Sequence, residues 1–216
     1  MKKTLKWNLA QKAELRWWEN YLQGKNIEEY LEWKRNYWQK LLDMVSISCP
    51  VESGKRILDA GCGPAGIFMN LPDCEVDALD PLLDEYDKKL SHFKKKNYSG
   101  VQFLSIPLEE LHTRGKYDIV FCMNAINHVS NLGRCYDLLA DAVKPGGKLV
   151  ITIDAHNYSF FKHLFRLLPG DILHPHQYDL EEYEDFLTDR NFRILQHEKL
   201  KKEFFFNHYL QVAIKR

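Results

Sequence analysis

A short apolar strand that runs directly into a glycine-rich turn is the feature that most constrains this chain. Residues 56–66 read Arg-Ile-Leu-Asp-Ala-Gly-Cys-Gly-Pro-Ala-Gly. Gly61 and Gly63 permit a tight turn and a close approach of the backbone to a ligand, and Pro64 favours a helix start whose free N–H groups face the same point. The pattern indicates a nucleotide-type cofactor loop, although glycine pairs also occur in ordinary turns.

A second predicted strand, residues 75–79, ends at Asp80 and is stopped by Pro81. Asp80 lies 17 positions after Gly63. In α/β cofactor domains an acidic residue at roughly this distance, about 20 positions on, accepts hydrogen bonds from ribose hydroxyls. The alternative is a solvated aspartate in a turn.

Further strands and helices alternate along the chain. Continuous apolar runs of this kind are typical of strands buried on both faces of a parallel sheet, and the intervening helices imply right-handed crossovers. The fold class is therefore α/β, with an open, doubly wound sheet. The predicted strands are 101–105, 117–123, 147–154, 192–195 and 204–214, and the predicted helices are 82–95, 132–143 and 179–190.

Five motifs in this order resemble those of the class I S-adenosylmethionine-dependent methyltransferases. They are the Ile-Leu-Asp-x-Gly-Cys-Gly loop, Asp80, Tyr-Asp-Ile-Val at 117–120, Asn-Ala-Ile-Asn-His-Val at 124–129 and Val-Lys-Pro-Gly-Gly at 143–147. The resemblance covers about residues 54–216. It implies a seven-stranded, mostly parallel Rossmann-like sheet with an antiparallel hairpin at the C-terminal edge. It also implies S-adenosyl-L-methionine as the methyl donor and S-adenosyl-L-homocysteine as the product.

The same resemblance implies a set of cofactor-binding residues. Asp80 accepts the ribose hydroxyls, and Asp59 with the Gly61–Gly63 backbone surrounds the methionine moiety. Two positions depart from the family pattern: Ala65 replaces a frequent third glycine, and Pro107 replaces an acidic residue that contacts adenine, with the Leu108 backbone as a substitute. The full set is Asp59, Gly61, Cys62, Gly63, Asp80, Pro81, Leu108, Asn124 and His128.

Methyl transfer from a sulfonium is an in-line displacement, so the protein mainly orients the acceptor and excludes water. A base is required only when a hydroxyl or a protonated amine is the acceptor, and histidine suits that role. The candidate catalytic residues are His128, His156 and His174. His128 has a structural alternative as a helix-start residue. His174 and His176 have the spacing of metal ligands without further partners, so no metal is predicted.

The acceptor is predicted to be a small molecule. Because ligands bind beyond the carboxyl ends of parallel strands, the loop 156–178 is expected to set the specificity. One alternative is an RNA or protein methyltransferase, although no Asn/Asp-Pro-Pro-Tyr motif follows the fourth strand, where Asn124 to Asn127 stand. Another alternative is a noncatalytic module that binds S-adenosylmethionine.

Composition is ordinary for a globular domain, with 45% hydrophobic and 28% charged residues. Thirty basic and thirty acidic residues give a net charge of zero, which does not favour nucleic-acid binding. The five cysteines lack metal-type spacing and are read as reduced thiols. The chain shows neither the apolar core of a signal peptide nor a membrane-spanning run, so a cytoplasmic location without membrane association is expected.

All five tryptophans lie between residues 7 and 38. Residues 14–22 and 27–45 have the periodicity of amphipathic helices, with a break at Gly24. We expect residues 1–50 to form an aromatic helical cap, or lid, on a methyltransferase domain that spans residues 51–216. The aromatic side chains either pack on the sheet or also line a substrate pocket.

Overall fold

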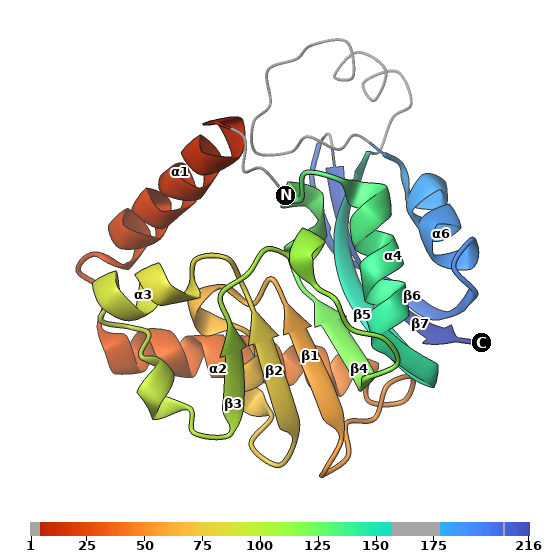
Figure 1. The fold of residues 1–216 in the computed structure, drawn as a ribbon, viewed down its shortest axis with the longest axis horizontal. Coiled ribbons are helices and arrows are strands. Elements are labelled where there is room, and N and C mark those ends of the chain that lie inside the picture. Colours follow the sequence, from red (N-terminus) through yellow and green to blue (C-terminus); the bar gives the residue numbers. More distant parts are fainter. Residues whose placement is uncertain (1–4, 157–177, 205) are drawn as a thin grey trace.

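The computed structural model describes residues 5–156, 178–204 and 206–216 (Figure 1). The strands are β1 (Arg56–Ala60), β2 (Glu75–Leu79), β3 (Val101–Leu104), β4 (Tyr117–Cys122), β5 (Val143–His156), β6 (Phe192–Lys202) and β7 (Phe206–Lys215). The α-helices are α1 (Leu5–Leu22), α2 (Ile27–Val45), α3 (Leu83–Lys89), α4 (Leu132–Ala142) and α6 (Leu180–Thr188). Short 3₁₀ turns are η1 (Gly63–Ala65), η2 (Ile67–Asn70), η3 (Lys95–Asn97), η4 (Leu108–Glu110) and η5 (Ile126–His128).

The strands form one sheet in the order β3-β2-β1-β4-β5-β7-β6. Strands β1 to β5 pair in parallel, and β7 runs antiparallel to both β5 and β6. The predicted α/β fold with a terminal antiparallel hairpin is therefore confirmed. Because the chain reverses its order of strands between β1 and β4, the loops after these two strands meet at the same edge, where ligands bind in such sheets.

Helices cover both faces of the sheet (Figure 1). Alternate residues of a strand point to opposite faces, so Ile57 of β1 joins the hydrophobic cluster of α1 and α2, whereas Leu58 joins that of α4 and α6. Helix α1 stands beside α3 at the end of the sheet to which the arrowheads of β1 and β2 point. The carboxyl edge of the sheet thus lies next to an N-terminal helix.

Some element boundaries differ from the predicted ones. No α-helix follows the glycine loop; residues 63–70 form only η1 and η2. The predicted helix 82–95 ends at Lys89, because the Asp87 carboxylate accepts a hydrogen bond from the Lys95 N–H at 2.8 Å and folds the chain back. Helix α1 starts at Leu5, nine residues before the predicted start, and β5 and β6 extend beyond their apolar runs.

Helix α2 is preceded by the N-cap residue Asn26, whose side chain accepts hydrogen bonds from the N–H groups of Glu28 and Glu29. Its buried residues are Tyr30, Trp38, Leu41 and Val45, whereas Trp33 is 52% exposed. The Trp38 indole N–H donates a hydrogen bond of 2.9 Å to the carbonyl of Ala65 in the glycine-rich turn. Helix α2 therefore both fills the core and anchors the turn.

Trp38→Phe should lower the free energy of unfolding by about 1–3 kcal/mol, because the buried Ala65 carbonyl loses its donor. Chemical denaturation followed by circular dichroism measures this difference. Trp33→Phe on the same helix is the matched control and should change stability by less than about 0.5 kcal/mol. Equal effects of the two substitutions would show that the hydrogen bond does not stabilise the turn.

Candidate functional site

The glycine turn after β1 has the backbone conformation that its sequence requires. Gly61 and Gly63 have φ angles of +75° and +57°, in the region that side chains disfavour. A Cβ atom on Gly61 would clash with the side chain of Ala125, in the loop after β4. The Gly61 and Cys62 N–H groups donate to the Leu79 carbonyl at 2.7 and 3.0 Å. The turn is thus fixed against the ends of both neighbouring strands.

Asp59 supports this turn from behind. Its buried carboxylate accepts a hydrogen bond of 3.0 Å from the Phe68 N–H, and a Cβ atom on Gly66 would clash with it. Burial raises the pKa of Asp59 to about 7, against the lowering effect of the N–H groups of Phe68 and Ile67. These contacts of Asp59 are structural, and its assignment to the methionine moiety stays a prediction.

Asp80 lies at the end of β2 and faces the turn. Its Oδ2 accepts from the Gly63 N–H at 3.1 Å and its Oδ1 from the Leu82 N–H at 2.8 Å. Each carboxylate oxygen has two acceptor sites, so both retain capacity for a ligand hydroxyl. Burial, followed by the neighbouring Glu14 carboxylate, raises the pKa of Asp80 to about 7. This arrangement fits the ribose of the predicted cofactor.

Helix α1 contributes residues that the sequence analysis did not assign to the site. The Glu14 carboxylate accepts a hydrogen bond of 3.2 Å from the Tyr86 hydroxyl of α3. One turn further, the Trp18 ring lies 3.7 Å from the position that a Cβ atom on Gly63 would take. The spacing of four residues places Glu14 and Trp18 on one helix face, a signal that the sequence did contain.

The loop after β4 is held by buried amide contacts. Asn124 has a φ of +54°, and its N–H donates to the Thr152 hydroxyl of β5 at 2.7 Å. Asn127 accepts from the Asp154 N–H at 3.1 Å and donates to the Asp154 carbonyl at 3.2 Å. His128 ends η5 with its side chain exposed at this edge. Asn124 and His128 therefore lie beside the turn, as the motif order predicts.

The end of β5 holds two histidine arrangements. The buried His156 ring packs on Phe206 of β7, with ring centroids 4.3 Å apart. Two pairs of residues earlier in the ladder, His208 Nδ1 lies 2.7 Å from Asp154 Oδ1. The sequence analysis missed this His–Asp pair, because its members are 54 positions apart. His174 and His176 lie outside the described residues.

The remaining predicted residues, Leu108, Pro81 and Cys62, follow the ends of β3, β2 and β1. Leu108 is buried after β3, and its neighbour Glu109 accepts from the Ser130 N–H at 2.7 Å, so this acidic side chain is used within the protein. Pro81 follows Asp80 directly, and Cys62 is a buried free thiol, as are three of the other four free cysteines. The structure thus gathers Gly61, Gly63, Asp80 and His128 at one edge, with the glycine turn between Asp80 and His128.

Comparisons with known proteins agree with this geometry. The methyltransferase domain family matches residues 30–197. A ubiquinone biosynthesis O-methyltransferase of Acinetobacter baumannii is 24% identical over 165 residues, which cover 71% of this chain and 67% of that protein. The crystal structure of YcgJ from Bacillus subtilis has a TM-score of 0.65 at 16% identity, over 81% of this chain and 97% of the other. A phosphoethanolamine N-methyltransferase of Haemonchus contortus, solved with S-adenosylhomocysteine, has a TM-score of 0.62 at 17% identity over 82% and 52%.

The matched region spans about two thirds of the length of the Acinetobacter relative. The family match and the motifs together show that the chain belongs to the class I S-adenosylmethionine-dependent methyltransferases. The solved structures, below 25% identity, show the shared fold. Within the ranges that the structure describes, no helix combines the length and apolar character needed to cross a membrane.

The raised pKa values of Asp59 and Asp80 predict an unusual pH dependence of stability. Folding raises each pKa from 3.8 to about 7, so between these values the folded protein retains protons that the unfolded chain has released. Stability from these groups is present at low pH and is lost as the pH rises through 7. Each carboxyl should cost about 1 kcal/mol of stability between pH 6 and pH 8.

Urea unfolding of the protein without cofactor, at pH 6 and at pH 8, measures this effect. Asp80→Asn removes one titrating group and should flatten the dependence by about half of the combined change. A slope identical in the wild type and in Asp80→Asn would mean that Asp80 does not titrate in this window.

Proposed function

We propose that this chain transfers the methyl group of S-adenosylmethionine to a hydroxyl group of a small molecule. The observation that carries the proposal is the buried Asp80 carboxylate hydrogen-bonded to the Gly63 N–H at the carboxyl edge of the sheet. The name of the Acinetobacter relative, an O-methyltransferase, supports oxygen as the acceptor atom. The free thiols among the described residues support a reducing, cytoplasmic location.

When bound, S-adenosylmethionine supplies a methyl group that its sulfonium has already activated. The chain has to bind the cofactor, position the acceptor in line and exclude water. Asp80 and the glycine turn hold the nucleoside and methionine parts. Helix α1 covers the turn through Trp18, which supports the proposal that residues 1–50 include a lid.

A hydroxyl acceptor has to lose a proton, and among the described residues the pair of His208 and Asp154 near the end of β5 supports a base for this step. Asp154 lies 2.7 Å from His208 Nδ1, so it favours the tautomer whose Nε2 accepts a proton. Asn127 in turn fixes the Asp154 backbone from the loop that also carries His128. We therefore place His208 before the predicted candidates His128, His156 and His174 as the acceptor base.

Incubation of the purified protein with S-adenosylmethionine and a library of hydroxylated metabolites tests the function. Formation of S-adenosylhomocysteine together with a product 14 mass units heavier would identify the acceptor. Turnover only with amines or thiols would overturn the oxygen assignment, and no turnover with any class would favour a noncatalytic binding module.

Asp80→Ala should weaken the binding of S-adenosylhomocysteine by about 1.5–3 kcal/mol, the range for hydrogen bonds to a charged group. Isothermal titration calorimetry measures the dissociation constant. Asp84→Ala is the control, because the Asp84 side chain is 62% exposed and pairs with Lys95. Unchanged affinity in Asp80→Ala would remove this residue from the site.

His208→Ala and Asp154→Asn should each lower kcat/KM for the hydroxyl acceptor by about 10²-fold or more, the lower end of general base contributions. Affinity for S-adenosylhomocysteine should stay within about twofold, because neither group is assigned to the cofactor. His197→Ala is a suitable control, since this histidine lies on the outer strand β6 and pairs with Glu184 of α6. Near-native turnover in both variants would assign the proton transfer to another group, with His128 tested next.

A further inference from the structure

We propose that Glu14 on α1 makes the affinity of the site depend on the charge of the cofactor's sulfur. The Glu14 carboxylate favours the cationic S-adenosylmethionine over S-adenosylhomocysteine, which lacks the sulfonium charge. The inference rests on the function proposed above. It assigns to the N-terminal helix a part in choosing between substrate and product, in addition to covering the site.

The position of Glu14 follows from its hydrogen bond to α3 and from its electrostatic interactions with residues at the carboxyl edge. The Tyr86 hydroxyl donates to its carboxylate at 3.2 Å, and Trp18, on the next turn of α1, lies against Gly63. Glu14 also lies close enough to Asp80 and to His128 to interact electrostatically with both. Asp80 follows β2 and His128 belongs to the loop after β4, and β1 lies between these strands in the sheet.

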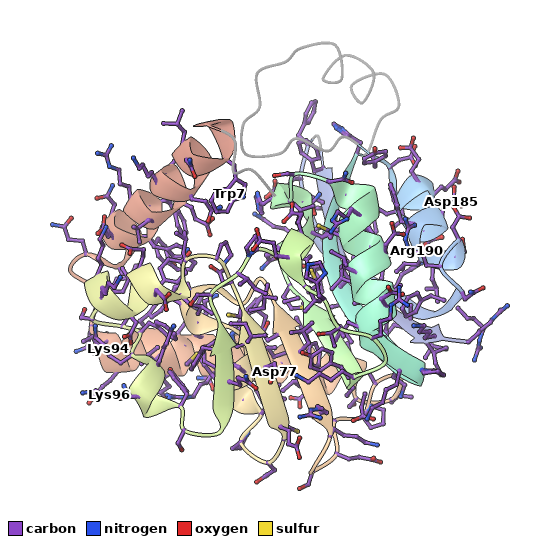
Figure 2. All side chains as sticks on the ribbon, in the orientation of Figure 1. Trp7, Asp77, Lys94, Lys96, Asp185 and Arg190 are labelled. Atoms are coloured by element: carbon purple, nitrogen blue, oxygen red, sulfur yellow. The ribbon has the colours of Figure 1, made fainter. Side chains whose placement is uncertain are left out.

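Glu14 consequently faces the middle of the carboxyl edge, above the turn assigned to the methionine end of the cofactor. Figure 2 shows Trp7, two helical turns earlier, on the side of α1 that faces the centre of the molecule. This face of α1 therefore brings both a carboxylate and aromatic rings toward the site. The sulfonium belongs to the part of the cofactor that this face covers.

The carboxylates around Glu14 favour the binding of a cation. Asp80 is a second carboxylate in the same site, and the repulsion between the two contributes to the raised pKa of Asp80. Burial raises the pKa of Glu14, while the hydrogen bond from Tyr86 and the neighbouring His128 act to lower it. The hydrogen bonds to Asp80 come from backbone N–H groups. A ligand with a positive charge between the two carboxylates relieves the repulsion.

Methyl transfer removes this charge. The bond between sulfur and the methyl carbon breaks with its electron pair left on sulfur, the acceptor oxygen forms the new bond, and its proton passes to the base. The sulfonium becomes a neutral thioether, while the ammonium and carboxylate groups of the methionine part are unchanged. The attraction of Glu14 for the sulfonium is therefore lost at the chemical step, which favours release of the product.

The test compares three ligands by titration calorimetry: S-adenosylmethionine, S-adenosylhomocysteine, and sinefungin, an analogue with an amine-bearing carbon in place of the sulfonium. Glu14→Gln keeps the size of the side chain and removes its charge. We expect it to weaken binding of both cationic ligands about 10-fold and of S-adenosylhomocysteine less than about twofold. Glu19→Gln on the same helix is the matched control and should leave all three affinities unchanged.

Equal losses for all three ligands in Glu14→Gln would overturn the inference and leave Glu14 a general support of the site. No loss for any ligand would also overturn it. Hydrogen exchange of residues 5–22 in the wild-type protein gives a second measurement that needs no variant. The two cationic ligands should protect α1 more than S-adenosylhomocysteine does, and equal protection contradicts the proposal. A wild-type chain that binds none of the three ligands would overturn the proposed function itself, and with it this inference.

Discussion

The hydrogen bond from the Phe68 N–H to the buried Asp59 carboxylate is the contact on which the rest of the site depends. It draws the chain back under the end of β1, and Gly66 leaves the space that the carboxylate needs. The turn above it can then present the Gly63 N–H to Asp80. Burying the charged form of Asp59 costs free energy, as its raised pKa indicates. The hydrogen bond that fixes the turn offsets part of this cost.

The glycine turn is supported by helix α2 and not by a helix that follows it in the chain. Residues 61–74 contain only η1 and η2 and form no α-helix that could brace the turn against the sheet. Trp38 of α2 supplies that support instead, through its hydrogen bond to the Ala65 carbonyl. The N-terminal helices thus belong to the hydrophobic core on this face of the sheet, and α1 is carried to the edge where Glu14 and Trp18 meet the site.

The sheet could be predicted from the sequence because each strand is marked by its own local run of apolar residues. The apolar runs at β1, β2 and β4 can be recognised without knowing which residues contact one another in the fold. The same holds for the glycines with positive φ angles. The end of the predicted helix at Lys89 was missed because it depends on a side-chain contact between Asp87 and a residue eight positions later. The pair of Asp154 and His208 was also missed because it depends on a contact between residues distant in sequence. Only the antiparallel register of β5 and β7 brings the two side chains together.

Charge shows most clearly why composition alone could not describe the site. The whole chain has thirty residues of each sign and no net charge, and its surface pairs, such as Lys88 with Glu85, are exposed and contribute little. At the carboxyl edge, by contrast, Asp59, Asp80 and Glu14 gather where burial strengthens every electrostatic interaction. A neutral protein thereby gathers three carboxyl groups at one edge of the sheet, with Lys34 close enough to Asp59 to interact electrostatically, and burial raises the pKa of each of the three.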